Sequence, residues 1–218
     1  MRLKIRNWIM LCFMLILLIN QNSIAVSATE TTNDARTAYV FIGDSRTVGM
    51  DNVVHMSDMD DTFVIAKVGM GAKWWQETGS LELHKLRTEN TQYNKWVYIF
   101  NLGVNDLGNV ETYKGIIDNL EKEATVYFIS INPTVDEVKG VQCASIEKFN
   151  ELIEPVCDNY IDSYSYLKYK GYYAKDGMHY DKATYQTLYE FIDESITLNE
   201  FLNEQHNAKQ VLGFMVKS

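Results

Sequence analysis

The hydrophobic positions of this chain fall into short, unbroken runs, separated by longer stretches in which apolar residues recur at helical spacing. The runs are rich in β-forming residues and predict buried strands at residues 38–42, 62–68, 96–102 and 125–131. The intervening stretches predict helices at residues 80–89, 112–124, 145–156 and 182–198. Continuous hydrophobicity in strands that alternate with helices is typical of a parallel sheet covered on both faces. We therefore expect an α/β fold, a three-layer α/β/α sandwich of flavodoxin-like type with a central, mainly parallel sheet.

The first residues of the chain carry a different pattern. Three cations within the first six residues precede an apolar run at residues 8–19, and a polar stretch then ends in small residues at 26–28. This order is typical of a secretory signal peptide, which we predict over residues 1–28. The apolar run is shorter than the about 20 residues that a membrane-spanning helix needs. We expect no stable membrane span after cleavage, and an uncleaved anchor is the alternative.

The rest of the chain divides into three predicted segments. Residues 29–36 are polar and aperiodic and should form a flexible lead-in. Residues 37–198 should form one folded domain. The tail at residues 199–218 contains enough apolar residues to pack against something, but the pattern does not indicate where.

The charge of the chain limits its partners. Twenty Lys and Arg against 29 Asp and Glu give a net charge of −9, and removal of the predicted signal peptide would take away three more cations and no anions. Such an acidic chain repels phosphate backbones, so we expect no nucleic-acid partner. The oligomeric state does not follow from the composition.

Two cysteines, Cys143 and Cys157, remain after the predicted cleavage. A helix between them would separate the two by about 21 Å at a rise of about 1.5 Å per residue. A disulfide needs Cα atoms within about 7 Å. We therefore expect two free thiols.

Candidate chemistry stands directly after the predicted strands, where parallel sheets bind their ligands. The first strand leads into Gly43-Asp44-Ser45, which delivers a serine to the start of a helix. The backbone N–H groups and dipole of a helix N-terminus would stabilise an oxyanion beside that serine. The alternative is that Asp44 or Ser45 only caps the helix.

The next two strands are followed by hydrogen-bond donors. Gly69-Met70-Gly71 lets a backbone N–H approach a ligand closely, or simply forms a tight turn. Asn105, within Gly103-Val104-Asn105-Asp106, offers a side-chain amide to an oxyanion, or is an ordinary turn residue.

A carboxylate and a histidine precede the last predicted helix. Asp176 stands three residues before His179, close enough to orient its imidazole. A serine nucleophile needs a base of this kind. Taken alone, His179 could equally be a surface histidine or one that is satisfied in the core.

Together and in this order, these segments resemble the signature blocks of the SGNH, or GDSL, hydrolase family. The resemblance implies an esterase in which Ser45 attacks the ester carbonyl, His179 is general base and acid, and Asp176 orients His179. It further implies an oxyanion hole formed by the N–H groups of Ser45 and Gly71 and the side chain of Asn105. Gly69 competes with Gly71 for its place. No cofactor is implied.

Three further residues near these segments are candidates for substrate binding. Arg46 stands where the family name has leucine, and it would either face an acidic substrate or be solvated and paired with an acid. Trp74 and Trp75 follow the glycine loop and would either stack on sugar rings or belong to the core.

The predicted function is a secreted or cell-wall-associated serine esterase that removes short acyl groups, above all acetyl, from carbohydrate or cell-wall polysaccharide. A lipid esterase or thioesterase and a secreted O-acetyltransferase are alternatives on the same fold. A non-catalytic α/β binding module is disfavoured because Ser45, Asn105 and His179 are all present. No spacing typical of a metal site occurs, so we expect no metal.

Overall fold

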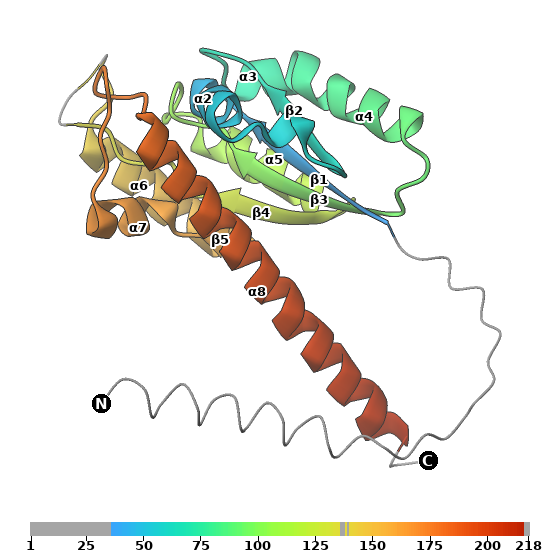
Figure 1. The fold of residues 1–218 in the computed structure, drawn as a ribbon. Coiled ribbons are helices and arrows are strands. Elements are labelled where there is room, and N and C mark those ends of the chain that lie inside the picture. Colours follow the sequence, from blue (N-terminus) through green and yellow to red (C-terminus); the bar gives the residue numbers. More distant parts are fainter. Residues whose placement is uncertain (1–35, 136–137, 139, 216–218) are drawn as a thin grey trace, which may run out of the picture. The chain divides into compact units, whose positions relative to one another are not determined.

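The computed structural model describes residues 36–135, 138 and 140–215, with side chains to residue 210. The predicted signal peptide and most of the predicted lead-in lie outside the described residues. A sheet of five parallel strands forms the centre of the fold, in the order β2-β1-β3-β4-β5 (Figure 1). The strands are β1 (Thr37–Gly43), β2 (Thr62–Ala66), β3 (Lys95–Asn101), β4 (Thr125–Ile129) and β5 (Asn159–Ile161). The predicted α/β fold with a parallel sheet is confirmed.

Helices connect the strands. The α-helices are α2 (Ser45–Val54), α3 (Ala72–Trp74), α4 (Ser80–Glu89), α5 (Val110–Glu121), α6 (Cys143–Ile153), α7 (Ser163–Lys170) and α8 (Lys182–Met215). Shorter turns are η1 (Met56–Asp58), the π-helical η2 (Trp75–Gly79) and η3 (Glu154–Val156).

Each face of the sheet has its own hydrophobic core, because successive side chains of a strand point to opposite faces. On one face, side chains such as Ile42 and Phe100 pack with apolar residues of α4, α5 and α6. On the other face, Phe41 and Ile99 pack with α2 and α8. Helices thus cover both faces, and the sandwich has the three predicted layers.

Helix α8 continues well past residue 198, where we predicted the domain to end (Figure 1). Glu200 links this extension to the sheet, because its carboxylate accepts hydrogen bonds from Tyr39 Oη at 2.9 Å and Lys95 Nζ at 3.0 Å. Leu198, Phe201 and Leu202 are each more than half exposed. These apolar side chains therefore lie on the surface of the described part of the chain. A search of the described residues finds no helix long and apolar enough to cross a membrane.

Candidate active site

The tight turn between β1 and α2 sets the position of Ser45. A Cβ on Gly43 would collide with the side chain of Thr47, so only glycine fits at the end of β1. Asp44 is the N-cap of α2, and its carboxylate accepts the backbone N–H of Arg46 at 2.9 Å. The cap is thus Asp44 and not Ser45. The hydroxyl of Ser45 is left to form another contact.

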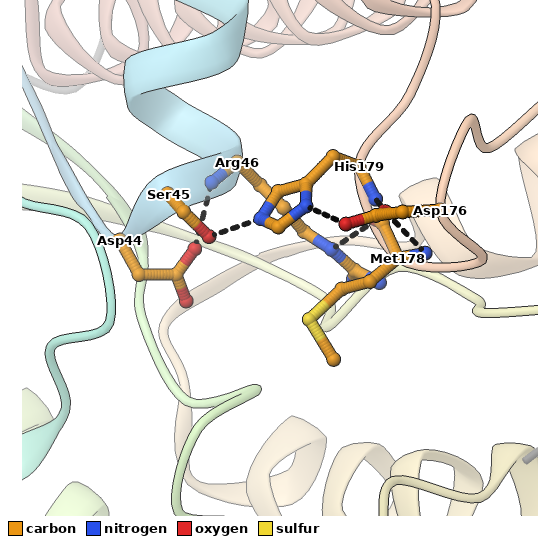
Figure 2. A network of polar contacts seen from close by, with 6 residues as sticks. All are labelled: Asp44, Ser45, Arg46, Asp176, Met178 and His179. Atoms are coloured by element: carbon orange, nitrogen blue, oxygen red, sulfur yellow. Dashed lines mark hydrogen bonds and ion pairs between the residues drawn. The ribbon is translucent and has the colours of Figure 1, made fainter. Parts of the chain in front are cut away.

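That contact is with His179. Ser45 Oγ lies 2.8 Å from His179 Nε2, although 134 residues separate the two in the chain (Figure 2). His179 Nδ1 lies 2.8 Å from Asp176 Oδ2. The other oxygen of Asp176 accepts the backbone N–H groups of Met178 and His179, at 3.1 and 2.8 Å. The structure thus brings together three residues that were predicted to act together, in the geometry by which a serine passes its proton to an oriented imidazole.

The loops after β2 and β3 meet beside this triad. Gly43 pairs with Ala66 of β2 and Asn101 of β3, so the three loops leave the sheet at the same level. Asn105 Nδ2 donates to the carbonyl of Met70 at 2.8 Å. That carbonyl belongs to the same peptide group as the N–H of Gly71, so two predicted oxyanion donors lie on adjoining groups.

Asp106 joins the same two loops from the other side. Its Oδ2 accepts the backbone N–H of Ala72 at 2.8 Å, and its Oδ1 accepts the hydroxyl of Tyr113 at 2.5 Å. A Cβ on Gly71 would collide with this carboxylate. A Cβ on Gly69, by contrast, would meet no atom within 4 Å, and this position requires glycine only because its φ is +76°. Gly71 is therefore the glycine in close contact with the loop that carries Asn105.

Asp44 is a buried carboxyl group directly before the serine, with 1% of its surface exposed. Burial raises the pKa of Asp44 to about 6, against the opposing effects of the Arg46 N–H and the nearby positive charge of Arg46. A group with this pKa changes its charge within the mildly acidic range.

Arg46 is buried and forms hydrogen bonds with backbone carbonyls. It is 2% exposed, and its guanidinium donates to the carbonyls of Met178, Asn132 and Pro133 at 3.2, 2.6 and 3.2 Å. Both interpretations made from the sequence, contact with an acidic substrate and a solvated residue paired with an acid, are therefore wrong.

Trp74 and Trp75 do not form an aromatic platform. They are 8% and 4% exposed and belong to the hydrophobic core. The ring of Trp75 packs edge-on against Phe100, with centroids 5.5 Å apart. Of the two interpretations, stacking on sugar is wrong and membership of the core is confirmed.

Sequence analysis missed the loop after β4 and the partner of Asp106. Asn132 and Pro133 stand at a strand end, so the rule that singled out Ser45 and Asn105 could have found them too. Tyr113 stands seven residues after Asp106, in the first turn of α5, whereas Asp106 lies in the loop before it. No helical spacing relates the two, so the pattern did not indicate this contact.

A cavity of about 620 Å³ opens beside Asn105. Its walls come from the loop after β3, the start of α5, the turn before α6 and α6 itself. They are about as polar as they are apolar, and Asn105, Ser145 and Lys148 are the polar members. A second cavity of about 680 Å³ lies between α4 and α5. Trp75 lines it, but none of the triad or predicted oxyanion residues does. The first cavity is the one that adjoins the candidate site. In the described part of the chain, no cluster of three His, Cys, Asp or Glu residues could hold a metal ion.

No protein-family model matches the chain, and no curated protein matches it significantly. Solved structures are similar to it. A protein of Slackia heliotrinireducens that is proposed to be an SGNH hydrolase has a TM-score of 0.59 at 13% identity, over 75% of this chain and 100% of that one. The catalytic domain of the peptidoglycan O-acetyltransferase OatA of Streptococcus pneumoniae has a TM-score of 0.55 at 17% identity, over 75% of this chain and 92% of that one. The acetylxylan esterase Axe2 of Geobacillus stearothermophilus has a TM-score of 0.53 at 12% identity, over 74% and 94%.

These identities are low, but the similarities agree on one architecture. Each covers about three quarters of this chain and nearly all of the other. The sheet order, the two helical layers and the position of the loops at the carboxyl edge are described above from this chain alone. The part of the chain that the structure describes has the fold of the SGNH hydrolases.

Proposed function

We propose that this protein is a serine esterase that acts outside the cytoplasm and removes short acyl groups, above all acetyl, from carbohydrate or cell-wall polysaccharide. The observation that carries the proposal is the hydrogen-bonded series Asp176–His179–Ser45 at the start of α2. A serine hydroxyl is a weak nucleophile unless a base takes its proton, and here the base is itself held by a carboxylate.

The reaction would proceed in two halves. Ser45 Oγ attacks the ester carbonyl while His179 Nε2 takes the hydroxyl proton, and the resulting oxyanion accepts hydrogen bonds from Ser45 N–H, Gly71 N–H and Asn105 Nδ2. His179 then gives this proton to the alcohol oxygen. The alcohol departs, and the acyl group stays on Ser45. A water molecule attacks the acyl group while His179 takes its proton. The bond between the acyl carbon and Ser45 Oγ then breaks, His179 returns the proton to Oγ, and the acid is released.

Two further observations support a short acyl group on a glycan. Lys67, Lys73 and Asn105 stand at the carboxyl edge of the sheet, and their polar groups would be costly to desolvate beside a long alkyl chain. The similar structures include enzymes that are named for acetylated xylan and for peptidoglycan acetylation. The predicted signal peptide would bring the protein to such substrates.

An O-acetyltransferase is the second candidate, and the similarity to the OatA domain favours it. The acyl-Ser45 intermediate is common to both reactions. The difference lies in whether water or a sugar hydroxyl accepts the acyl group.

The deciding experiment measures hydrolysis of p-nitrophenyl esters from acetate to decanoate, together with acetate release from acetylated xylan and acetylated peptidoglycan. We expect activity that is greatest with acetate and is lost in Ser45→Ala and His179→Ala. Ser165→Ala and His84→Ala, changes at exposed positions outside the triad, serve as controls. A folded, fully active Ser45→Ala protein would refute the mechanism.

The same panel separates the alternatives. A binding pocket for alkyl chains gains up to about 0.8 kcal/mol per buried CH₂. Activity that rises steadily toward decanoate, with no acetate freed from either polymer, would therefore indicate a lipid esterase. Activity on acetate that increases when a sugar acceptor is added would indicate the transferase.

A further inference from the structure

The side chain of Arg46 connects the start of α2, which carries Ser45, to two other segments of the candidate site. Arg46 follows Ser45 in α2, and its guanidinium forms hydrogen bonds with two segments far along the chain, of which Figure 2 shows the one at Met178. One is the loop after β4, through the carbonyls of Asn132 and Pro133. The other is the segment that carries His179, through the carbonyl of Met178.

The bond to Met178 acts on the backbone of the histidine. The Met178 carbonyl and the His179 N–H belong to one peptide group. Arg46 Nε holds the oxygen of this group at 3.2 Å, and Asp176 Oδ1 holds its N–H at 2.8 Å. A planar peptide group that is held at both ends fixes the position of the Cα atom from which the next side chain starts. Here that side chain is the imidazole that must meet Ser45 Oγ.

The surroundings of the guanidinium suit this task. Among the described residues, its hydrogen-bond acceptors are carbonyl oxygens, and the ring of Tyr180 lies 5.2 Å from its central carbon. The hydroxyl of Tyr180 also donates to the carbonyl of Pro133. Burying a charge in this way is unfavourable unless the geometry is good, and the five N–H donors of the planar guanidinium can reach three separate carbonyls at once.

We propose that Arg46 is a positioning residue of the active site, which sets the distance between Ser45 and His179 by holding the Met178–His179 peptide group. The kinetic test of this inference rests on the proposed function. The spectroscopic test is independent of that function. Misplacement of a reacting group by about 1 Å can lower a rate by about 10²-fold. Arg46 is 2% exposed and therefore out of reach of a substrate, so its loss should act on kcat and leave KM nearly unchanged.

The kinetic test compares Arg46→Met, Arg46→Lys and Arg46→Ala with wild type on p-nitrophenyl acetate. We expect kcat to fall about 10- to 100-fold in Arg46→Met with KM within about twofold, and to fall less in Arg46→Lys, which keeps the charge. Guanidinium ion at millimolar concentration should restore part of kcat to Arg46→Ala. Arg87→Met and Arg87→Ala are matched controls, because Arg87 also packs over an aromatic ring, that of Trp96, but its ion pair is with Glu123 near the surface.

The spectroscopic test follows the ring proton between His179 Nδ1 and Asp176 by NMR. We expect its downfield signal to be lost in Arg46→Met and kept in Arg87→Met. If wild type hydrolyses no ester but this signal still depends on Arg46, the proposed function fails and the positioning role stands.

Two results would overturn the positioning role. One is a folded Arg46→Met protein with wild-type kcat and an unchanged His179 signal. The other is a set of Arg46 variants that all lose thermal stability in parallel with kcat, with no recovery in Arg46→Lys or in guanidinium, because this would show that Arg46 only maintains the fold.

Discussion

At the scale of single residues, three consecutive side chains at the start of α2 have three different surroundings. Asp44 caps the helix, Ser45 reaches His179, and Arg46 bonds to buried carbonyls (Figure 2). The position of Ser45 could be predicted, because the end of a parallel strand is a place that topology specifies in advance. The burial of Arg46 could not, since its acceptors stand 86 to 132 residues away.

Asn105 is expected to act on the transition state. Asn105→Ala should lower kcat about 10²- to 10³-fold with little change in KM, because the amide is proposed to bind a charge that develops only during the reaction. Steady-state kinetics on p-nitrophenyl acetate measures this, with Asn119→Ala as the control on the exposed face of α5. An unchanged kcat would reduce Asn105 to a residue that holds the Met70 carbonyl.

Asp44 should make stability depend on pH. The pKa of the folded protein, about 6, lies above the value of 3.8 for an unperturbed aspartate. The contribution of Asp44 to the free energy of unfolding is then full below pH 3.8 and is lost as the pH rises through 6, because the folded state binds the proton more tightly. The loss is up to about 3 kcal/mol.

The comparison is with Asp44→Asn, which keeps a good helix cap and cannot ionise. Urea unfolding from pH 4 to pH 8 should show the wild type losing stability relative to the variant up to about pH 7, with a constant difference above. A difference that stays constant over the whole range would show that the Asp44 carboxyl is not desolvated in solution.

At the scale of elements, the short loop between β2 and α3 is the most demanding part of the candidate site. Gly71→Ala should lower kcat and the melting temperature together, since the new Cβ would displace the Asp106 carboxylate that holds Ala72. Gly108→Ala is the control, because its Cβ would meet no atom within 4 Å. Calorimetry and ester hydrolysis measure the two effects. Wild-type behaviour of Gly71→Ala would point to Gly69 as the donor.

The elements that the sequence predicted, and those that it did not, differ in length and in apolar content. The four longer strands are unbroken apolar runs and were predicted. Strand β5 has only three residues, with Ile161 alone fully buried, and gave no run to detect. Helix α7 buries Ser163, Tyr164 and Leu167, a set without an apolar stripe. Helix α8 runs beyond its predicted end because no Gly or Pro occurs between residues 198 and 213 to stop it.

At the scale of the whole molecule, the residues of the candidate site could be predicted from two different signals, sheet topology and side-chain chemistry. Gly71, Ser45 and Asn105 follow β2, β1 and β3, which are neighbours in the sheet, so the topological rule placed them together. Asp176 and His179 follow no strand, and only their chemistry pointed to them. Whether Trp74 and Trp75 face the site was left open, because exposure is a property of the assembled fold. Trp74 and Trp75 stand next to the site in sequence but pack into the core.

The two described cysteines are free thiols, as expected. The thiol of Cys143 donates to the carbonyl of Thr134 and that of Cys157 to the carbonyl of Ile153. Burial raises the pKa of Cys157 to about 12, which keeps it unreactive. Reductant should therefore leave the melting temperature unchanged, and alkylation in denaturant without reductant should label both thiols. Labelling of neither would reveal a disulfide.

Ser45 follows β1, the first strand, whereas His179 comes after β5, the last, and 134 residues separate the two. A protein divided at the turn between α5 and β4 would carry the proposed nucleophile on one fragment and the proposed base on the other. The two fragments would meet through the pairing of β3 with β4 and through the packing of α2 against α8. Under the proposed mechanism neither fragment alone should cleave an ester, so that ester hydrolysis would report the docking of the two fragments.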